Sequence, residues 1–168
     1  METTIPQSCL QCEHRPERFL CDLPADALQA FDGIKSTARI PRGQILFDEG
    51  QSAHSAFVLC QGRVRLSVGV GASSGKKVLL RIAGPGEILG LSASLSGRRH
   101  EVTAEALDNV QVAVIQRNNL RRYLKDHCDA CLQVLQLLSQ DLENAYSRVR
   151  SVGLTRTRRA RTSRSRLV

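Results

Sequence analysis

The chain has 168 residues, about the length of one ordinary domain, and it is 42% hydrophobic and 24% charged, a composition typical of a globular protein. No apolar run approaches the roughly 20 residues that a membrane span requires. No Lys or Arg precedes a hydrophobic stretch in residues 1–10, so a secretory signal is not expected. These features exclude a membrane protein and predict a cytoplasmic one.

The positive charge of the chain is concentrated at its carboxyl end. The formal net charge is +8, but residues 1–147 contain equal numbers of acidic and basic residues, and residues 148–168 contain arginines and no acid. The body of the chain is therefore neutral. This weakens the case for a dedicated surface that reads nucleic acid.

One helix followed by short strands is predicted for the first two thirds of the chain. Residues 24–34 are expected to be helical, because Pro24 suits a first turn and Gly33 a last one. Strand-like segments between glycine turns then follow at 37–40, 44–48, 56–60, 63–70, 77–82, 102–106 and 111–115. Alternation is clearest at the apolar positions Val64, Leu66, Val68 and Val70. The pattern predicts a mainly β fold with helices (α+β), built as an antiparallel sandwich or barrel.

Helix returns near residue 118. Asn118 or Asn119 can cap a helix over 120–125, and a long helix is expected from about residue 127. Its apolar residues alternate in steps of four and three, and we call them the helix seam: Cys131, Leu135, Leu138, Leu142, Ala145, Val149 and Val152. Such a heptad pattern favours a homodimer through this helix. Packing of an amphipathic helix on the chain's own sheet is the alternative.

Residues 154–168 are rich in Arg, Thr and Ser and have almost no apolar content. Such a composition cannot form a core, so we predict a disordered tail after Gly153. Its arginines would contact nucleic acid or acidic surfaces without sequence preference, or they would have no role.

The glycine-rich segment from Gly84 to Gly97 allows two interpretations. Backbone N–H groups at such a turn can hold a phosphate; alternatively, the segment is a turn with a short buried helix. It is not a P-loop, because no Lys follows the glycines.

Three cysteines near the amino terminus, Cys9-x2-Cys12-x8-Cys21, carry the sharpest chemical signal. A CxxC pair can place two thiolates on one metal ion, and a third Cys extends the site. Disulfides are not expected in a reducing cytosol. An iron–sulfur cluster, a zinc site completed by His14, a thiol redox switch and no metal at all remain open.

Several motifs together resemble the Crp/Fnr regulators. They are Asp48-Glu49-Gly50, the stretch from Val58 to Val64, the stretch from Gly84 to Gly90, and the long helix, and the resemblance covers residues 19–152. It implies a cyclic-nucleotide-binding-type β-roll, a jelly-roll barrel, followed by a long C-terminal dimerisation helix. The expected parts are a Cys-rich segment at 1–22, the roll sensor domain at 23–126, the dimerisation helix at 127–153 and the tail at 154–168.

The resemblance also indicates a ligand pocket, but with altered residues. Members that bind cAMP hold it with a Glu after the glycine turn and an Arg-Ser pair before the next strand. The corresponding positions are Leu91, and His100 with Glu101, so cAMP is not expected to bind. The pocket positions are Gly86, Glu87, Gly90, Leu91, Ser92, Arg98, Arg99 and His100.

Oxygen-sensing members of the family bind a 4Fe–4S cluster through an amino-terminal cysteine trio and a fourth Cys on a late strand. The resemblance assigns Cys9, Cys12 and Cys21 as metal ligands, although the second spacing is longer here. The fourth position falls near Ala113, so Cys60, His14 or an acidic residue would have to complete the site. Zinc is the second candidate for the metal.

In the family, a helix-turn-helix domain follows the long helix, whereas this sequence ends there. DNA and RNA polymerase are therefore expected as partners only of a full-length version, and the chain is expected to pair with an intact subunit. The predicted function is the sensory and dimerisation module of a Crp/Fnr-type transcriptional regulator, responsive to redox state, oxygen or nitric oxide. The alternatives are a standalone module for a small cyclic-nucleotide-like ligand and a cupin-type enzyme. No catalytic residues are predicted, because no Ser/His/Asp set or paired carboxylates occur.

Overall fold

The computed structural model describes residues 8–12, 22–70 and 75–164, with side chains up to residue 151. It divides into two units, Met1–Cys131 and Leu132–Val168, which are considered separately. The first unit contains all the strands among the described residues, three α-helices and the start of a fourth, and one 3-10 turn, η1 (Cys9–Gln11).

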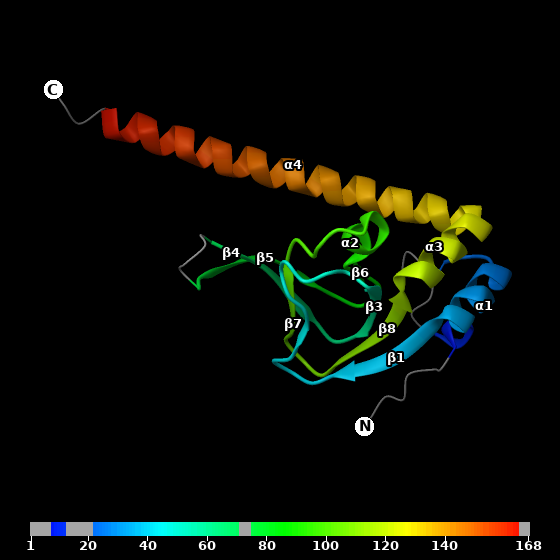
Figure 1. Ribbon diagram of the computed structural model, residues 1–168. Helices are drawn as coiled ribbons and strands as arrows, with labels where there is room; N and C mark the ends of the chain where they lie inside the picture. Colours follow the sequence, from blue (N-terminus) through cyan, green and yellow to red (C-terminus); the bar gives the residue numbers. More distant parts are fainter. Residues whose placement is uncertain (1–7, 13–21, 71–74, 165–168) are drawn as a thin grey trace. The chain divides into compact units, whose positions relative to one another are not determined.

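Two four-stranded antiparallel sheets form the roll (Figure 1). The first sheet has the order β1 (Lys35–Ile40), β8 (Val110–Gln116), β3 (Ser55–Gln61) and β6 (Ile88–Leu89). The second has the order β2 (Ile45–Phe47), β7 (Thr103–Ala106), β4 (Val64–Gly69) and β5 (Lys77–Ala83). Strands distant in sequence are thus neighbours, which confirms the predicted antiparallel β-roll.

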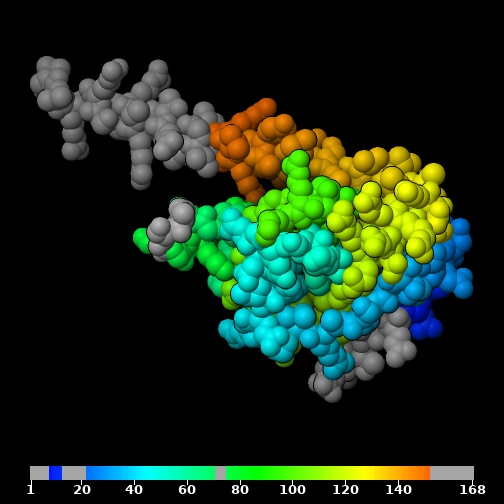
Figure 2. Space-filling view, in the orientation of Figure 1, coloured from blue at the N-terminus to red at the C-terminus, as the bar shows by residue number. Residues whose placement is uncertain are grey.

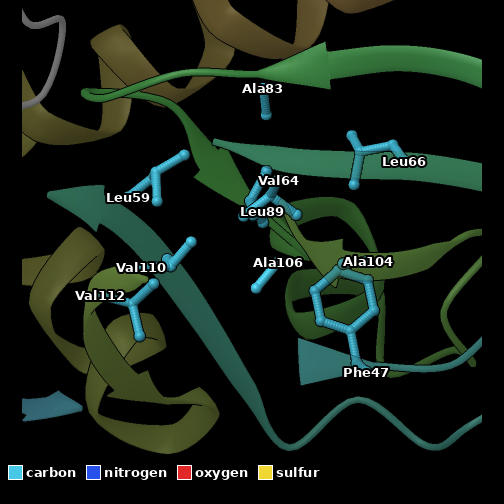
Figure 3. Packing of buried hydrophobic residues seen from close by; sticks show 10 residues of the cluster. All are labelled: Phe47, Leu59, Val64, Leu66, Ala83, Leu89, Ala104, Ala106, Val110 and Val112. Carbon is cyan, nitrogen blue, oxygen red and sulfur yellow. The ribbon is translucent and has the colours of Figure 1, made fainter. Parts of the chain in front are cut away.

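Strand β8 is at the centre of the first sheet and pairs with both β1 and β3. A strand that is buried on both faces carries apolar residues at nearly every position. Strand β8 fits this description, since Val110, Val112, Ala113 and Ile115 are all buried. Side chains from both sheets meet in one core (Figure 3): Phe47, Leu59, Val64, Leu66, Ala83, Leu89, Ala104, Ala106, Val110 and Val112.

The alternation predicted for residues 63–70 is wrong after Leu66. A β-bulge between Leu66 and Ser67 shifts the register against β5, so that Leu66 pairs with Arg81 but Ser67 pairs with Leu79. The extra residue, Leu80, belongs to β5, whereas β4 pairs with β7 in an unbroken register. Ser67 of β4 is nevertheless buried, and Val70 is exposed. Strand β6 was not predicted, because two residues are too few to show any period.

Helix α1 (Ala25–Ile34) matches the predicted helix, and it buries Ala27, Leu28 and Phe31. It lies beside α3 (Arg117–Asp126). In the space-filling view, the blue residues of α1 and the yellow residues of α3 share one face of this unit (Figure 2). The ring of Tyr123 meets that of Phe31 edge to face, with centroids 5.6 Å apart. Its hydroxyl donates a 3.0 Å hydrogen bond to the carbonyl oxygen of Ala27.

The glycine-rich segment contains the predicted short helix, α2 (Leu91–Ser96). Gly90 precedes it and Gly97 follows it, both in the left-handed conformation with φ of 69° and 76°. Glycine adopts this conformation without the steric cost that other residues incur. Both ends of α2 therefore depend on glycine.

The long helix, α4 (Cys128–Arg164), starts after His127, whose extended conformation separates it from α3. It continues past Gly153 to Arg164, so the structure includes residues 154–164 of the expected tail in the helix. Arginine has a high intrinsic helix propensity, which offsets the lack of apolar residues there. Residues 165–168 are outside the described part, and the division into four segments stays a prediction.

Replacing Leu59 by Ala should destabilise the roll by about 2–5 kcal/mol, because Leu59 is fully buried and its loss leaves a cavity. Urea unfolding at one protein concentration measures the change. Leu79→Ala is the matched control, since Leu79 is 54% exposed, and it should change stability by no more than about 0.5 kcal/mol. Equal effects of the two substitutions would contradict the assignment of the core.

Candidate functional site

The polar groups of the glycine turn at 84–87 form hydrogen bonds and an ion pair within the chain. The amide of Gly84 donates a 2.7 Å hydrogen bond to the carboxylate of Glu87, which also forms an ion pair with Arg81. The amide of Gly86 donates to the carbonyl oxygen of Leu59 at 2.7 Å, and that of Glu87 donates to Gly84. These donors already have acceptors within the chain, so the turn does not present them to a phosphate.

His100 occupies the interior of the predicted pocket. Its side chain stacks on Phe47 with ring centroids 3.9 Å apart, and the residue is 5% exposed. A Cβ atom on Gly90 would lie 2.8 Å from the His100 ring, so the ring packs directly against the backbone at Gly90. The main chain of His100 is bonded to that of Gln51 and Gly50. An imidazole thus lies at the position that the sequence resemblance matches to the arginine of cAMP-binding members.

The remaining pocket positions face in different directions. Leu91 is buried at the start of α2, whereas Ser92 and Arg98 are exposed. The hydroxyl of Ser92 is 3.5 Å from the carboxylate of Glu101. Arg99 donates to the carbonyl oxygen of Gly50 at 2.6 Å. The structure therefore brings His100 and Gly90 together but provides no buried arginine at this site.

Burial lowers the pKa of His100 below its usual value, the nearby His54 lowers it further, and Glu101 opposes the change. Protonation should therefore favour the unfolded chain, which binds the extra proton more readily. We predict that His100 contributes stability that is present above about pH 6.5 and is lost as the pH falls through the lower folded-state pKa.

Urea unfolding across this pH range tests the prediction. His100→Phe keeps an aromatic ring against Phe47 but cannot titrate, so it should lose this part of the pH dependence. His54→Gln is the matched control, because His54 is exposed, and it should keep most of the dependence. Identical pH profiles for wild type and His100→Phe would show that His100 does not contribute.

The amino-terminal cysteine segment is anchored to the end of α1. Asp32 in the last turn of α1 accepts hydrogen bonds from the Ser8 hydroxyl (2.5 Å) and from the Cys9 amide (2.9 Å). Lys35 forms an ion pair with the same carboxylate at 2.7 Å and donates to Cys9 Sγ at 2.9 Å. We call Ser8, Cys9, Asp32 and Lys35 the cysteine anchor.

Hydrogen bonds and burial within the cysteine anchor shift the pKa values of its three titratable groups. Burial alone would raise the pKa of Asp32, but hydrogen bonds from Lys35, Ser8 and Cys9 lower it to about 2. Burial would lower the pKa of Lys35, yet its bonds with Asp32 and Cys9 raise it. Burial raises the pKa of the Cys9 thiol to about 12, although Lys35 opposes this. The resting state is therefore a carboxylate, an ammonium and a protonated thiol.

The predicted metal ligands are only partly within the described residues. Cys9 and Cys12 lie at the two ends of η1 and are half-buried, while Cys21 and His14 are outside the described part. Ala113, at the expected fourth ligand position, is buried in β8. Within residues 8–12, 22–70 and 75–164, no group of three or more His, Cys, Asp or Glu side chains is arranged to hold a metal ion.

Sequence reasoning missed Ser8, Asp32 and Lys35. The three-residue spacing of Asp32 and Lys35 is typical of a helical ion pair, but many surface pairs share it. Nothing in the sequence connects that pair to Cys9, which lies 26 residues before Lys35.

The helix seam is largely exposed. Leu135, Leu142 and Val149 are exposed, and so are Leu132 and Tyr146, which the sequence analysis did not include. Leu138 and Cys131 are half-buried, and Ala145 is exposed; the side chain of Val152 is outside the described part. None of the described helices is long and apolar enough to span a membrane.

The cyclic nucleotide-binding domain family matches residues 37–127. A CRP-like cAMP-activated global transcriptional regulator of Mycobacterium tuberculosis is 26% identical over 102 residues, covering 61% of this chain and 45% of that protein. The anaerobic regulatory protein of Bacillus subtilis is 24% identical over 131 residues, covering 77% of this chain and 54% of that protein. This chain thus spans about half the length of these relatives.

The fold agrees with these matches. The crystal structure of Thermus thermophilus catabolite activator protein superimposes with a TM-score of 0.71 at 18% identity, covering 80% of this chain and 62% of that chain. The two antiparallel sheets and the long helix correspond to the architecture expected from the sequence. The chain belongs to the cyclic nucleotide-binding domain family and, within it, to the Crp/Fnr regulators.

Proposed function

We propose that this chain is the sensory and dimerisation module of a Crp/Fnr-type transcriptional regulator. Its signal would be redox state, oxygen or nitric oxide, received by the amino-terminal cysteines. It would act on transcription when joined to a helix-turn-helix domain, and only then would DNA and RNA polymerase be its partners. The chain is a regulatory module and not an enzyme.

The packing of His100 is the observation that carries this proposal. A cyclic nucleotide brings a charged phosphate into the roll, and such a group needs charge-assisted hydrogen bonds. His100 fills the position against Phe47 and Gly90, and burial favours its neutral form. The adjacent Glu101 carboxylate would repel a phosphate. These features argue against cAMP as the signal. The amino-terminal cysteines are then the remaining candidates for the group that receives it.

The cysteine anchor connects the cysteines with the roll. Asp32 belongs to α1, and Lys35 is the first residue of β1 and pairs with Ile115 of the central strand β8. On the other side, α1 contacts Tyr123 of α3. A change at Cys9 would therefore alter bonds to a helix and a strand that both belong to the roll, which is a physical route from the signal to the rest of the unit.

The described cysteines fit a metal centre only in part. A metal ligand requires the thiolate form, whereas burial raises the pKa of the Cys9 thiol and the Lys35 ammonium beside Sγ only partly opposes this. Metal binding at Cys9 would therefore have to displace the thiol proton. Cys12 would be the second ligand. A 4Fe–4S cluster takes four protein ligands in total, and the residues described here supply two, so a cluster is a candidate cofactor and zinc is the second.

The exposed residues of the helix seam support a homodimer. Leu135, Leu142 and Val149 recur every seven residues and are exposed in the single chain. Burial of each Leu in an interface would contribute roughly 1.5–3 kcal/mol. A second copy of the same helix offers the same repeat, as in a two-stranded coiled coil.

Anaerobic purification with iron, sulfide and zinc analysis tests the sensory role. We expect the chain to carry metal or free thiols that change on exposure to air, and we expect Cys9→Ser to abolish the change. Cys128→Ser is the matched control, because Cys128 is exposed and distant in sequence. An unchanged response in Cys9→Ser would refute the role of the amino-terminal cysteines.

Titration with cAMP distinguishes the sensory module from the alternative, a standalone module that binds a small cyclic-nucleotide-like ligand. We expect no binding, because the pocket lacks a buried arginine. Micromolar binding that is lost on a Gly90 substitution would instead establish the chain as a small-ligand module.

Replacing Leu142 by Glu tests the dimer. Two copies of Leu142 would each lose about 1.5 kcal/mol of burial, so dimerisation should weaken by about a hundredfold or more. Sedimentation or light scattering measures the association. Gln140→Glu adds the same charge at an exposed position five residues after Leu135, outside the seam, and should leave the dimer intact. A dimer that withstands Leu142→Glu would place the interface elsewhere.

A further inference from the structure

We propose that Cys9 and Lys35 form an oxidation-responsive pair, in which one oxygen atom is inserted between Cys9 Sγ and Lys35 Nζ to give a covalent N–O–S bridge. The inference rests on the proposed redox role of the amino-terminal cysteines and specifies the chemistry at one of them. Dioxygen is the oxidant.

The two reacting atoms are already in contact. Lys35 Nζ lies 2.9 Å from Cys9 Sγ, and the Lys35 side chain is only 9% exposed. A lysine side chain in water samples many rotamers, whereas this one is held in a single position. Holding two groups at contact distance makes their reaction effectively unimolecular, which favours it strongly over reaction with groups in solution.

Further contacts hold both residues of the pair in place. On the sulfur side, the Cys9 amide and the Ser8 hydroxyl bond to Asp32 of α1. On the nitrogen side, Lys35 begins β1 and pairs with Ile115. The contact therefore does not depend on the chance approach of two flexible segments.

The geometry favours a bridging oxygen over a direct sulfur–nitrogen bond. A direct bond would require Nζ to move well inside its present separation from Sγ and away from Asp32 Oδ1, to which it is paired at 2.7 Å. One oxygen atom fits between Sγ and Nζ with little movement of either side chain. The structure thus accommodates the bridged product in nearly the resting conformation.

The reaction balances with one molecule of dioxygen. The resting pair is a thiol and an ammonium, and Asp32 is the neighbouring base that passes the extra ammonium proton to solvent. The O–O bond breaks, one oxygen atom bonds to both Sγ and Nζ, and the other leaves as water with the thiol proton and one amine proton. Sulfur and nitrogen together lose four electrons, and dioxygen gains four.

Bridge formation would change the charge at the end of α1. The bridged nitrogen is no longer an ammonium, so Asp32 would lose its ion-pair partner and keep only the Ser8 hydroxyl and the Cys9 amide as donors. The bridge would also tie residues 8–12 covalently to β1. Oxidation would therefore remove the positive charge of Lys35 and add a covalent link between residues 8–12 and β1.

Mass spectrometry of the full chain, purified without air and then exposed to air, tests the proposal. We expect the intact chain to gain one oxygen atom and lose two hydrogen atoms, and a thiol reductant to reverse this. After trypsin digestion, the peptide containing Cys9 should be linked to the peptide containing Lys35.

Matched variants identify the partners. Lys35→Arg keeps the charge and the donors but offers no amine, and Cys9→Ser removes the sulfur, so both should lose the mass change. Cys12→Ser should keep it. A mass change that persists in Lys35→Arg, or a loss of two hydrogens without oxygen, would overturn the proposal. So would an unmodified pair after prolonged exposure to air.

Iron, zinc and association state, measured on the same samples, separate this inference from the proposed function. If air alters metal content or association while the bridge is absent, the inference fails and the sensory role stands. If the bridge forms and nothing else responds, the chemistry is correct and the sensory role fails.

Discussion

Burial of strand β8 between β1 and β3 is the constraint on which the rest of the roll depends. Both neighbours take their register from it, and its apolar residues form the centre of the core. The position of Lys35 at the end of β1 follows from this register. Ala113, at the position where the resemblance expects a fourth ligand, is buried in the same strand.

The two candidate sites of this chain differ in how their polar groups are satisfied. In the glycine turn, the Gly84 amide donates to the Glu87 carboxylate, which also pairs with Arg81. His100 packs against Phe47 and Gly90. In the cysteine anchor, one carboxylate collects three donors, and one of those donors also touches a sulfur. The first site is closed by its own contacts. The second has a reactive atom as one of its contacts, so chemistry at that atom has structural consequences.

The sequence predicted elements whose signals are local. The helix at 24–34, the strand series and the glycine-flanked short helix depend on neighbouring residues, and they appear where expected. The bulge at Leu80 of β5 was not predicted, because a register shift depends on the partner strand. The partners of Cys9 were not predictable for the same reason: Asp32 and Lys35 reach it only through the fold. His100 was identified by position within a family pattern, whereas its stacking on Phe47 became visible only in three dimensions.

Strand β5 has a consequence for the behaviour of the chain in solution. It is the last strand of its sheet, and Val78, Leu79 and Ile82 are about half exposed. An unpaired apolar edge is a template for strand addition by another molecule. We therefore expect concentrated preparations to be limited by edge-to-edge aggregation of folded chains rather than by unfolding. Added salt should aggravate this, because it screens the repulsion between chains that each carry a formal net charge of +8.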